Sequence, residues 1–184
     1  MIKALLFDFD GTLYNTNDVN YYAYSEALKK FGVELDYKYY CEKCNGRNYR
    51  EFIPELVNFD QEVVEQVHTM KQQLYPTALN KAKVNEKLFD LIDMTKNTCK
   101  VAIVTTASRK NVLNMLEATG KTGVFDLIIC GEDVSHYKPD PEGYNLAMQK
   151  LGVMPDETII FEDSSYGIEA AHRSGATVYV VKYF

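Results

Sequence analysis

This chain of 184 residues has little cysteine and little histidine, which limits its options for disulfides and zinc. Its four cysteines, Cys41, Cys44, Cys99 and Cys130, are too few and too scattered for a disulfide framework. Cys41 and Cys44 form one Cys-x-x-Cys pair, but a zinc site needs four ligands and the chain has only three histidines. We therefore interpret the pair as helix packing and the cysteines as reduced thiols.

Long hydrophobic runs, repeats and excess positive charge are also missing. No apolar stretch approaches the roughly 20 residues of a membrane span, so the composition argues against a membrane protein. The net charge of −6 argues against broad binding to nucleic acid or to an anionic membrane, although a local basic pocket for one phosphate is compatible with it. The first residues lead directly into a strand, so we expect no removable signal segment and a cytoplasmic location.

What is present is typical of a soluble globular protein. Hydrophobic residues make up 46% of the chain and charged residues 25%. A chain of this length buries roughly 70% of its unfolded surface, which allows one substantial core and a small second domain. The sequence favours no particular oligomeric state.

The opening segment, Lys3 to Leu13, is an apolar run that ends in two aspartates and a glycine. The run suits a strand buried on both faces of a parallel sheet. Asp8 and Asp10 then lie at the carboxyl end of that strand and share one side, where a hard cation such as Mg2+ would relieve their repulsion. Asp-Gly is also a common turn dipeptide, so this segment by itself leaves a capped turn as an alternative.

Two zones follow the opening strand. From Asn15 to about Pro76 the pattern is helical, with one helix to about Phe31 and a long one after Asp60. From Asn85 onward short apolar runs alternate with helical patterns, which predicts a doubly wound α/β fold with five parallel strands. We expect a catalytic core of residues 1–15 and 80–184 and a small all-helical cap of residues 16–79. The expected strands after the first are 100–105, 127–130, 158–161 and 177–181.

Polar residues stand at the ends of the later strands. Thr105 ends one strand and can hold a phosphate oxygen, whereas Thr106 and Ser108 are better explained as helix caps. Lys138 precedes two prolines, and a stiff loop there would fix its charge near the same sheet edge. A solvated surface lysine is the alternative.

A second acidic pair, Glu162 and Asp163, follows the fourth strand. Asp163 would complete an oxygen-rich metal site, and Glu162 could bind through water or orient the other ligands. Acidic residues at a helix N-terminus often only complement the helix dipole, which is the alternative for this pair.

Together these segments resemble the haloacid dehalogenase superfamily of phosphotransferases. The resemblance rests on Asp8-x-Asp10-Gly11-Thr12-Leu13, the strand ending in Thr105, Lys138-Pro139 and Glu162-Asp163, in that order. It extends over almost the whole chain. The helical insertion after the first strand is similar to the cap of phosphoglycolate-phosphatase-like and β-phosphoglucomutase-like members.

The resemblance implies a role for each motif. Asp8 would be the nucleophile that forms an aspartyl-phosphate, and Asp10 the acid and base. Mg2+ would bind Asp8, the backbone carbonyl of Asp10, and Asp163, with Glu162 in support. Thr105 and Lys138 would hold the phosphoryl group. The expected substrate is a small phosphorylated metabolite, and the expected reaction is hydrolysis of a phosphate monoester.

Two other functions remain as alternatives. A β-phosphoglucomutase-like sugar-phosphate mutase would share every core residue, but mutase-like members usually carry a histidine that the stretch Asn17 to Tyr22 lacks. Arg47 and Arg50 are candidates for binding a second anionic group, or else exposed helix charges. A catalytically idle binding protein would have no need of the complete set of motif residues.

Overall fold

The computed structural model describes residues 1–45, 47 and 49–182. A five-stranded sheet lies at its centre, in the order β5-β4-β1-β6-β7, and each neighbouring pair of strands is parallel. The predicted fold class is therefore confirmed. The strands are β1 (Ala4–Phe7), β4 (Lys100–Val104), β5 (Leu127–Ile129), β6 (Thr158–Glu162) and β7 (Thr177–Val180).

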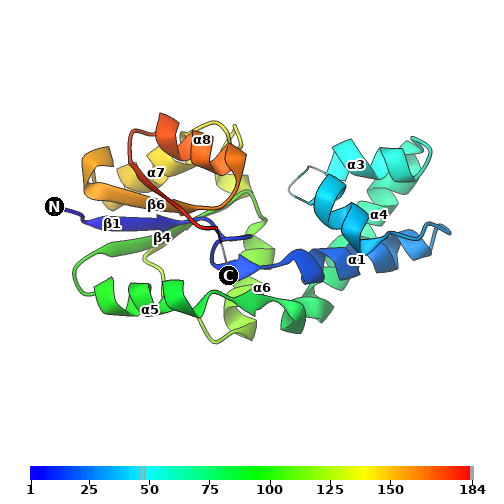
Figure 1. Cartoon of the computed structure of the whole chain (residues 1–184), viewed down its shortest axis with the longest axis horizontal. Coiled ribbons are helices and arrows are strands. Elements are labelled where there is room, and N and C mark those ends of the chain that lie inside the picture. The colour runs from blue at the N-terminus through cyan, green and yellow to red at the C-terminus, as the bar shows by residue number, and fades with distance from the viewer. Residues whose placement is uncertain (46, 48, 183–184) are drawn as a thin grey trace. The chain divides into compact units, whose positions relative to one another are not determined.

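Helices cover both faces of this sheet because its strands are apolar on both sides. Figure 1 shows α7 and α8 on one face and α5 on the other. The core on the α7 side joins strand residues such as Leu6 and Ile160 to Ala147 and Ala171 of the helices. The elements are α5 (Glu86–Thr95), α6 (Arg109–Ala118), η3 (Gly131–Asp133), α7 (Glu142–Leu151), η4 (Pro155–Glu157) and α8 (Ser165–Arg173).

A short antiparallel ribbon is an addition that the sequence pattern did not predict. It pairs β2 (Tyr14–Asn15) with β3 (Lys83–Val84). Beside it, the buried Asn85 donates its side-chain amide to the carbonyl oxygen of Thr12 at 3.1 Å, and its backbone N–H to that of Leu13 at 2.9 Å. These bonds anchor the turn that follows β1.

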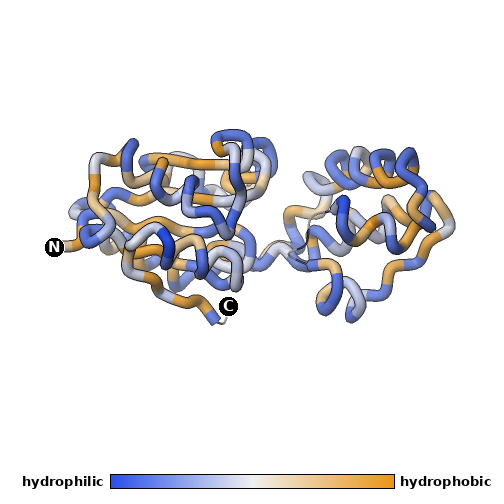
Figure 2. The backbone as a smooth tube through the Cα atoms, turned by 90° about the horizontal axis from the view of Figure 1, so that it is seen from above, coloured by the Kyte–Doolittle hydropathy of each residue, from blue (hydrophilic) through white to orange (hydrophobic). Residues whose placement is uncertain are grey.

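The chain divides into two compact units, residues 1–15 with 83–184 (unit 1) and residues 16–82 (unit 2). Unit 2 is the helical insertion after the first strand, and along its helices hydrophobic and hydrophilic residues alternate in Figure 2, as in helices that bury one face. Its elements are α1 (Asn17–Lys29), α2 (Tyr37–Tyr39), η1 (Tyr40–Cys44), α3 (Tyr49–Leu56), α4 (Gln61–Leu74) and η2 (Tyr75–Lys81).

The core of unit 2 is formed by residues from most of these helices, including Leu28, Phe52 and Val67. Cys44 is buried in this core and Cys41 packs against it, as expected for thiols that serve helix packing. Among the helices of the described residues, none combines the length and hydrophobicity that a membrane crossing requires.

Candidate active site

The register of the sheet places three strand ends side by side. β1 lies between β4 and β6, and Phe7 is aligned with Ile103 on one side and Phe161 on the other. The next residue, Asp8, donates its backbone N–H to the carbonyl oxygen of Phe161 at 3.0 Å. The polar residues that follow the strands therefore gather at one edge of the sheet.

Lys138 extends from its loop into this edge. Its ammonium nitrogen lies 2.5 Å from Asp8 Oδ1, 2.5 Å from Glu162 Oε1 and 3.0 Å from the carbonyl oxygen of Val104. The side chain is only 11% exposed. The Lys138–Pro139 peptide is cis, and Arg173 donates a hydrogen bond of 2.9 Å to the carbonyl oxygen of Pro139. The contacts of the ammonium nitrogen with Asp8, Glu162 and the Val104 carbonyl oxygen provide a partner for each of its three N–H donors.

Glu162 is fully buried and is held by several donors. Its Oε1 accepts from Lys138 and, at 2.8 Å, from the hydroxyl of Tyr144. Its Oε2 accepts from the backbone N–H groups of Asp163 and Ser164 and from the Ser164 hydroxyl, at 3.1 to 3.2 Å. Both oxygens of the Glu162 carboxylate thus accept hydrogen bonds, and one of them is shared by Lys138 and Tyr144.

Asp163 completes an acidic group with Asp8 and Glu162, whose ligand oxygens all lie within 4.8 Å of one another. The hydroxyl of Thr12 donates to Asp163 Oδ1 at 2.9 Å. Among the described residues, this is the one group of three or more side chains that could hold a metal ion. Cys41 and Cys44 do not belong to it.

Burial sets the electrostatics of this group. It raises the pKa of Asp8 well above its usual value, although Lys138 acts against the rise. Burial also raises the pKa of Asp163 to about 6. For Lys138 burial alone would lower the pKa, but the nearby Asp8, Tyr144 and Glu162 raise it. Two buried carboxylates, Asp8 and Glu162, and the less buried Asp163 lie beside one ammonium, and a divalent cation would balance their excess of negative charge.

The other expected core residues lie at the same strand ends. Thr105 directly follows β4, is 5% exposed, and accepts the Ala107 backbone N–H at 3.0 Å. Asp10 lies in the turn after β1, where its backbone forms an isolated β-bridge with that of Tyr14. Thr105 is next to Val104, whose carbonyl oxygen Lys138 contacts.

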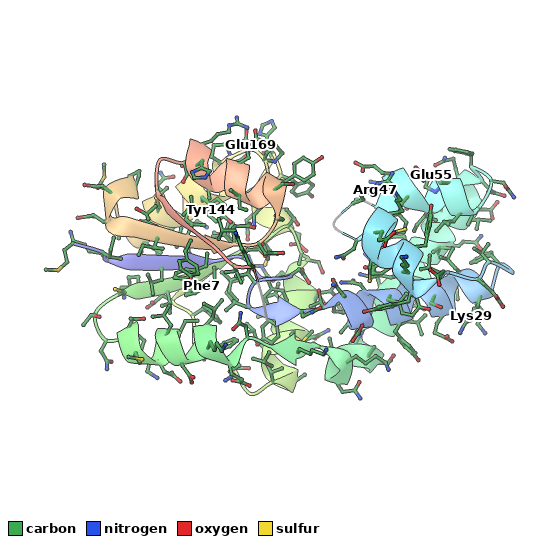
Figure 3. The ribbon with its side chains drawn as sticks, viewed as in Figure 1. Phe7, Lys29, Arg47, Glu55, Tyr144 and Glu169 are labelled. Atoms are coloured by element: carbon green, nitrogen blue, oxygen red, sulfur yellow. The ribbon has the colours of Figure 1, made fainter. Side chains whose placement is uncertain are left out.

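The two arginines singled out in the sequence are in ion pairs within unit 2. Arg47 lies 3.0 Å from Glu55 and 3.7 Å from Glu51, and Figure 3 shows it beside Glu55. Arg50 lies 3.3 Å from Glu65. Their role in binding an anionic group stays a prediction.

Comparison with known proteins now identifies the family. The model of the haloacid dehalogenase-like hydrolase family matches residues 5–181. The chain belongs to this family. A phosphorylated carbohydrates phosphatase of Thermotoga maritima is 29% identical over 185 residues, covering 95% of this hydrolase and 82% of the relative.

Two solved structures are similar to the hydrolase over its whole length. CbbY from Rhodobacter sphaeroides in complex with phosphate is 29% identical, with a TM-score of 0.86 over 100% of this chain and 88% of that chain. A putative β-phosphoglucomutase from Thermotoga maritima is 27% identical, with a TM-score of 0.81 over 100% and 87%. The hydrolase thus has phosphatases among its relatives and also a mutase-like neighbour.

Two residues of the hydrolase contact this site although the sequence assigned them no role. In the sequence Thr12 is only one member of the motif after the first strand, and its bond to Asp163 joins positions 151 residues apart. Tyr144 has the pattern of a buried helix residue, and only the tertiary structure brings its hydroxyl to Glu162. No local spacing could have indicated either contact.

Proposed function

We propose that the hydrolase removes phosphate from a small phosphorylated metabolite, with sugar phosphates as the first class to test. The observation that carries the proposal is a buried carboxylate, Asp8, in contact with a buried ammonium, Lys138, at the carboxyl end of the central strand. Phosphoryl transfer depends mainly on in-line positioning and on neutralising charge, and such a pair can supply both. The phosphatase activity named for a relative supports the same class.

The residues present fit Mg2+ as a cofactor. Asp8 and Asp163 would hold the ion together with the backbone carbonyl of Asp10, because carboxylate and carbonyl oxygens are its preferred ligands. The excess negative charge of the group supports this assignment. When bound, Mg2+ would neutralise charge on the phosphoryl oxygens. Glu162 would support the site by holding Lys138.

Asp8 would act as the nucleophile. Its carboxylate attacks the phosphorus, the bond to the leaving oxygen breaks, and Asp10 donates a proton to that oxygen. Water then attacks the aspartyl-phosphate while Asp10 accepts its proton, which releases inorganic phosphate and restores Asp8. Thr105 and Lys138 hold the phosphoryl group during both steps.

A mutase is the second candidate, and the similarity to a putative β-phosphoglucomutase favours it. A mutase would return the phosphoryl group to a sugar instead of to water. The two functions are distinguished by a sugar bisphosphate, because a mutase depends on such a primer for turnover and a phosphatase does not.

The first test is phosphate release from a panel of sugar phosphates, nucleotides and small phospho-acids. We expect release by the wild-type chain with Mg2+, none with EDTA, and a loss of at least about 1,000-fold in Asp8→Asn, which cannot act as nucleophile. Asp90→Asn, a change at an exposed position of α5, is the matched control and keeps full activity. Isomerisation that requires a bisphosphate would favour the mutase, and equal release by Asp8→Asn and wild type would refute the assigned nucleophile.

A further inference from the structure

Tyr144 lies in α7, outside the strand-end motifs, yet it contacts the centre of the site. The side chain is 1% exposed and belongs to the core between α7 and the sheet (Figure 3). Its hydroxyl donates to Glu162 Oε1 at 2.8 Å. A residue that only filled this core space would need no hydroxyl group, because phenylalanine would pack the same volume.

The hydroxyl is one of two donors to the Glu162 oxygen that faces Lys138. The other donor is Lys138 itself, since the backbone and side-chain donors of Asp163 and Ser164 bind the opposite oxygen. Without the hydroxyl, a fully buried carboxylate oxygen loses one of its partners, and buried charged groups depend strongly on such partners. The Tyr144 bond therefore adds to the contacts that hold the Glu162 carboxylate in its orientation, on the oxygen shared with Lys138.

Tyr144 also contacts Lys138 directly. The Lys138 ammonium nitrogen lies 5.1 Å from the centre of the Tyr144 ring, within the range of a cation–π contact. The ammonium is thus in contact with Asp8, Glu162, the carbonyl oxygen of Val104 and this aromatic face. Two of these four contacts involve Tyr144, one directly and one through Glu162.

We infer that Tyr144 is a positioning residue for phosphoryl transfer, whose hydroxyl and ring hold Glu162 and Lys138 in place beside Asp8. The inference rests on the proposed function in one respect, the assignment of Lys138 to the phosphoryl group. Tyr144 acts through these neighbours. Groups that orient the residues of a reacting centre in this way typically contribute about 10- to 100-fold to activity.

The first experiment compares Tyr144→Phe with Tyr14→Phe. Tyr14 is the matched control because it is also fully buried in unit 1 and its hydroxyl bonds Thr119 at 2.9 Å. With a substrate that the wild type hydrolyses, we expect kcat to fall about 10- to 100-fold in Tyr144→Phe while KM changes less than about threefold. In Tyr14→Phe kcat stays within about twofold of wild type, since the change removes only the hydroxyl bond to Thr119 and keeps the backbone bridge between Tyr14 and Asp10. Equal kcat in both variants would overturn the inference.

A double-mutant cycle shows whether Tyr144 acts through Glu162. In a Glu162→Gln background, we expect Tyr144→Phe to lower kcat by less than about twofold further, because the oriented carboxylate is already gone. A purely structural role would give the same loss in both backgrounds. That additive result would contradict the inference even if Tyr144→Phe alone is slow.

A third measurement needs no turnover. In a chain with 15N-labelled lysine, the ammonium signal of Lys138, assigned from its loss in Lys138→Met, reports hydrogen exchange with water. We expect exchange at least about 10-fold faster in Tyr144→Phe and unchanged in Tyr14→Phe, because local opening sets exchange of buried groups. A wild type without phosphatase activity but with this difference would contradict the proposed function alone. Unchanged exchange in Tyr144→Phe would overturn the positioning role in an active or an inactive enzyme.

Discussion

Gly11 follows the paired aspartates at a position where a side chain does not fit. Its φ is +94°, and a Cβ atom there would lie 2.1 Å from Asp163 Oδ2. Gly11→Ala therefore both strains the backbone and displaces a carboxylate that would hold Mg2+. We expect phosphate release, measured at saturating substrate and Mg2+, to fall by about 10- to 100-fold, as for other changes that displace a metal ligand.

Gly152 provides the control for this prediction. It has a φ of +68° at the end of α7, but a Cβ atom there would meet nothing within 4 Å. Gly152→Ala should lower the free energy of unfolding by about 1–2 kcal/mol from backbone strain alone and leave phosphate release unchanged. Equal activity of Gly11→Ala and Gly152→Ala would show that the contact with Asp163 is unimportant.

The cysteines differ in burial, and this difference predicts their reactivity. Cys130 is 0% exposed, and burial raises its pKa to about 11, whereas Cys41 and Cys99 are partly exposed. Since the thiolate is the reacting form, Cys130 should remain unlabelled by iodoacetamide at pH 8 and gain reactivity only as the pH rises toward 11. Peptide mass spectrometry should find label on Cys41 and Cys99 first.

Unfolding in guanidinium chloride supplies the control, because every thiol then becomes accessible and should be labelled at pH 8. If Cys130 in the folded chain reacts as fast as Cys41 at that pH, the burial described for it is wrong.

The sequence could indicate most of the residues that meet in the site but not their mutual contacts. Asp8, Lys138 and Asp163 each follow a strand or stand in a stiff loop, and this local feature is visible in the order of residues. The contacts of Thr12 and Tyr144 depend on the register of distant segments. The chemical roles of all these residues stay predictions until the variants are measured.

Among the elements, α4 has a helix cap that can be tested. Asp60 accepts hydrogen bonds from the backbone N–H groups of Glu62 and Val63 at 3.0 and 3.2 Å. Asp60→Ala should lower the free energy of unfolding by about 1 kcal/mol, the usual value for a lost helix cap. Asp60→Asn keeps an acceptor oxygen and should stay within a few tenths of a kcal/mol of wild type by the same reasoning. Denaturant titration of the wild type, Asp60→Ala and Asp60→Asn measures these free energies of unfolding. Equal denaturation midpoints for the wild type and Asp60→Ala would contradict the prediction.

The elements were predictable where the sequence shows an apolar run or a helical pattern of several residues. The five strands are short apolar runs at the predicted places, and the long helix begins directly after Asp60 as expected. The first helix ends at Lys29, two residues before the expected end at about Phe31. β2 and β3 have two residues each, too few to show the alternation that identifies a strand.

For the molecule as a whole, a bound metal should appear in thermal unfolding. A ligand at 100 times its dissociation constant stabilises the folded state by about 2.7 kcal/mol. For a chain of this size, Mg2+ should raise the Tm of the wild type by about 5 to 10 °C, and EDTA should reverse the rise. Asp163→Asn should show no such shift, whereas the surface variant Asp90→Asn should show all of it. The same Tm with and without Mg2+ in the wild type would argue against the metal assignment.

The divided sequence of unit 1 has a consequence for synthesis on the ribosome. β1 precedes the other strands of the sheet in the chain and is the central one, but its two partner strands begin only at Lys100 and Thr158. Unit 2 is continuous in sequence and is complete before either partner exists. Because synthesis proceeds at about 5 to 20 residues per second, the second neighbouring strand of β1 is synthesised on the order of 10 s after β1 itself. In the nascent chain the hydrophobic β1 therefore stays unpaired even after all of unit 2 has been synthesised. This makes β1 the segment that a chaperone would protect.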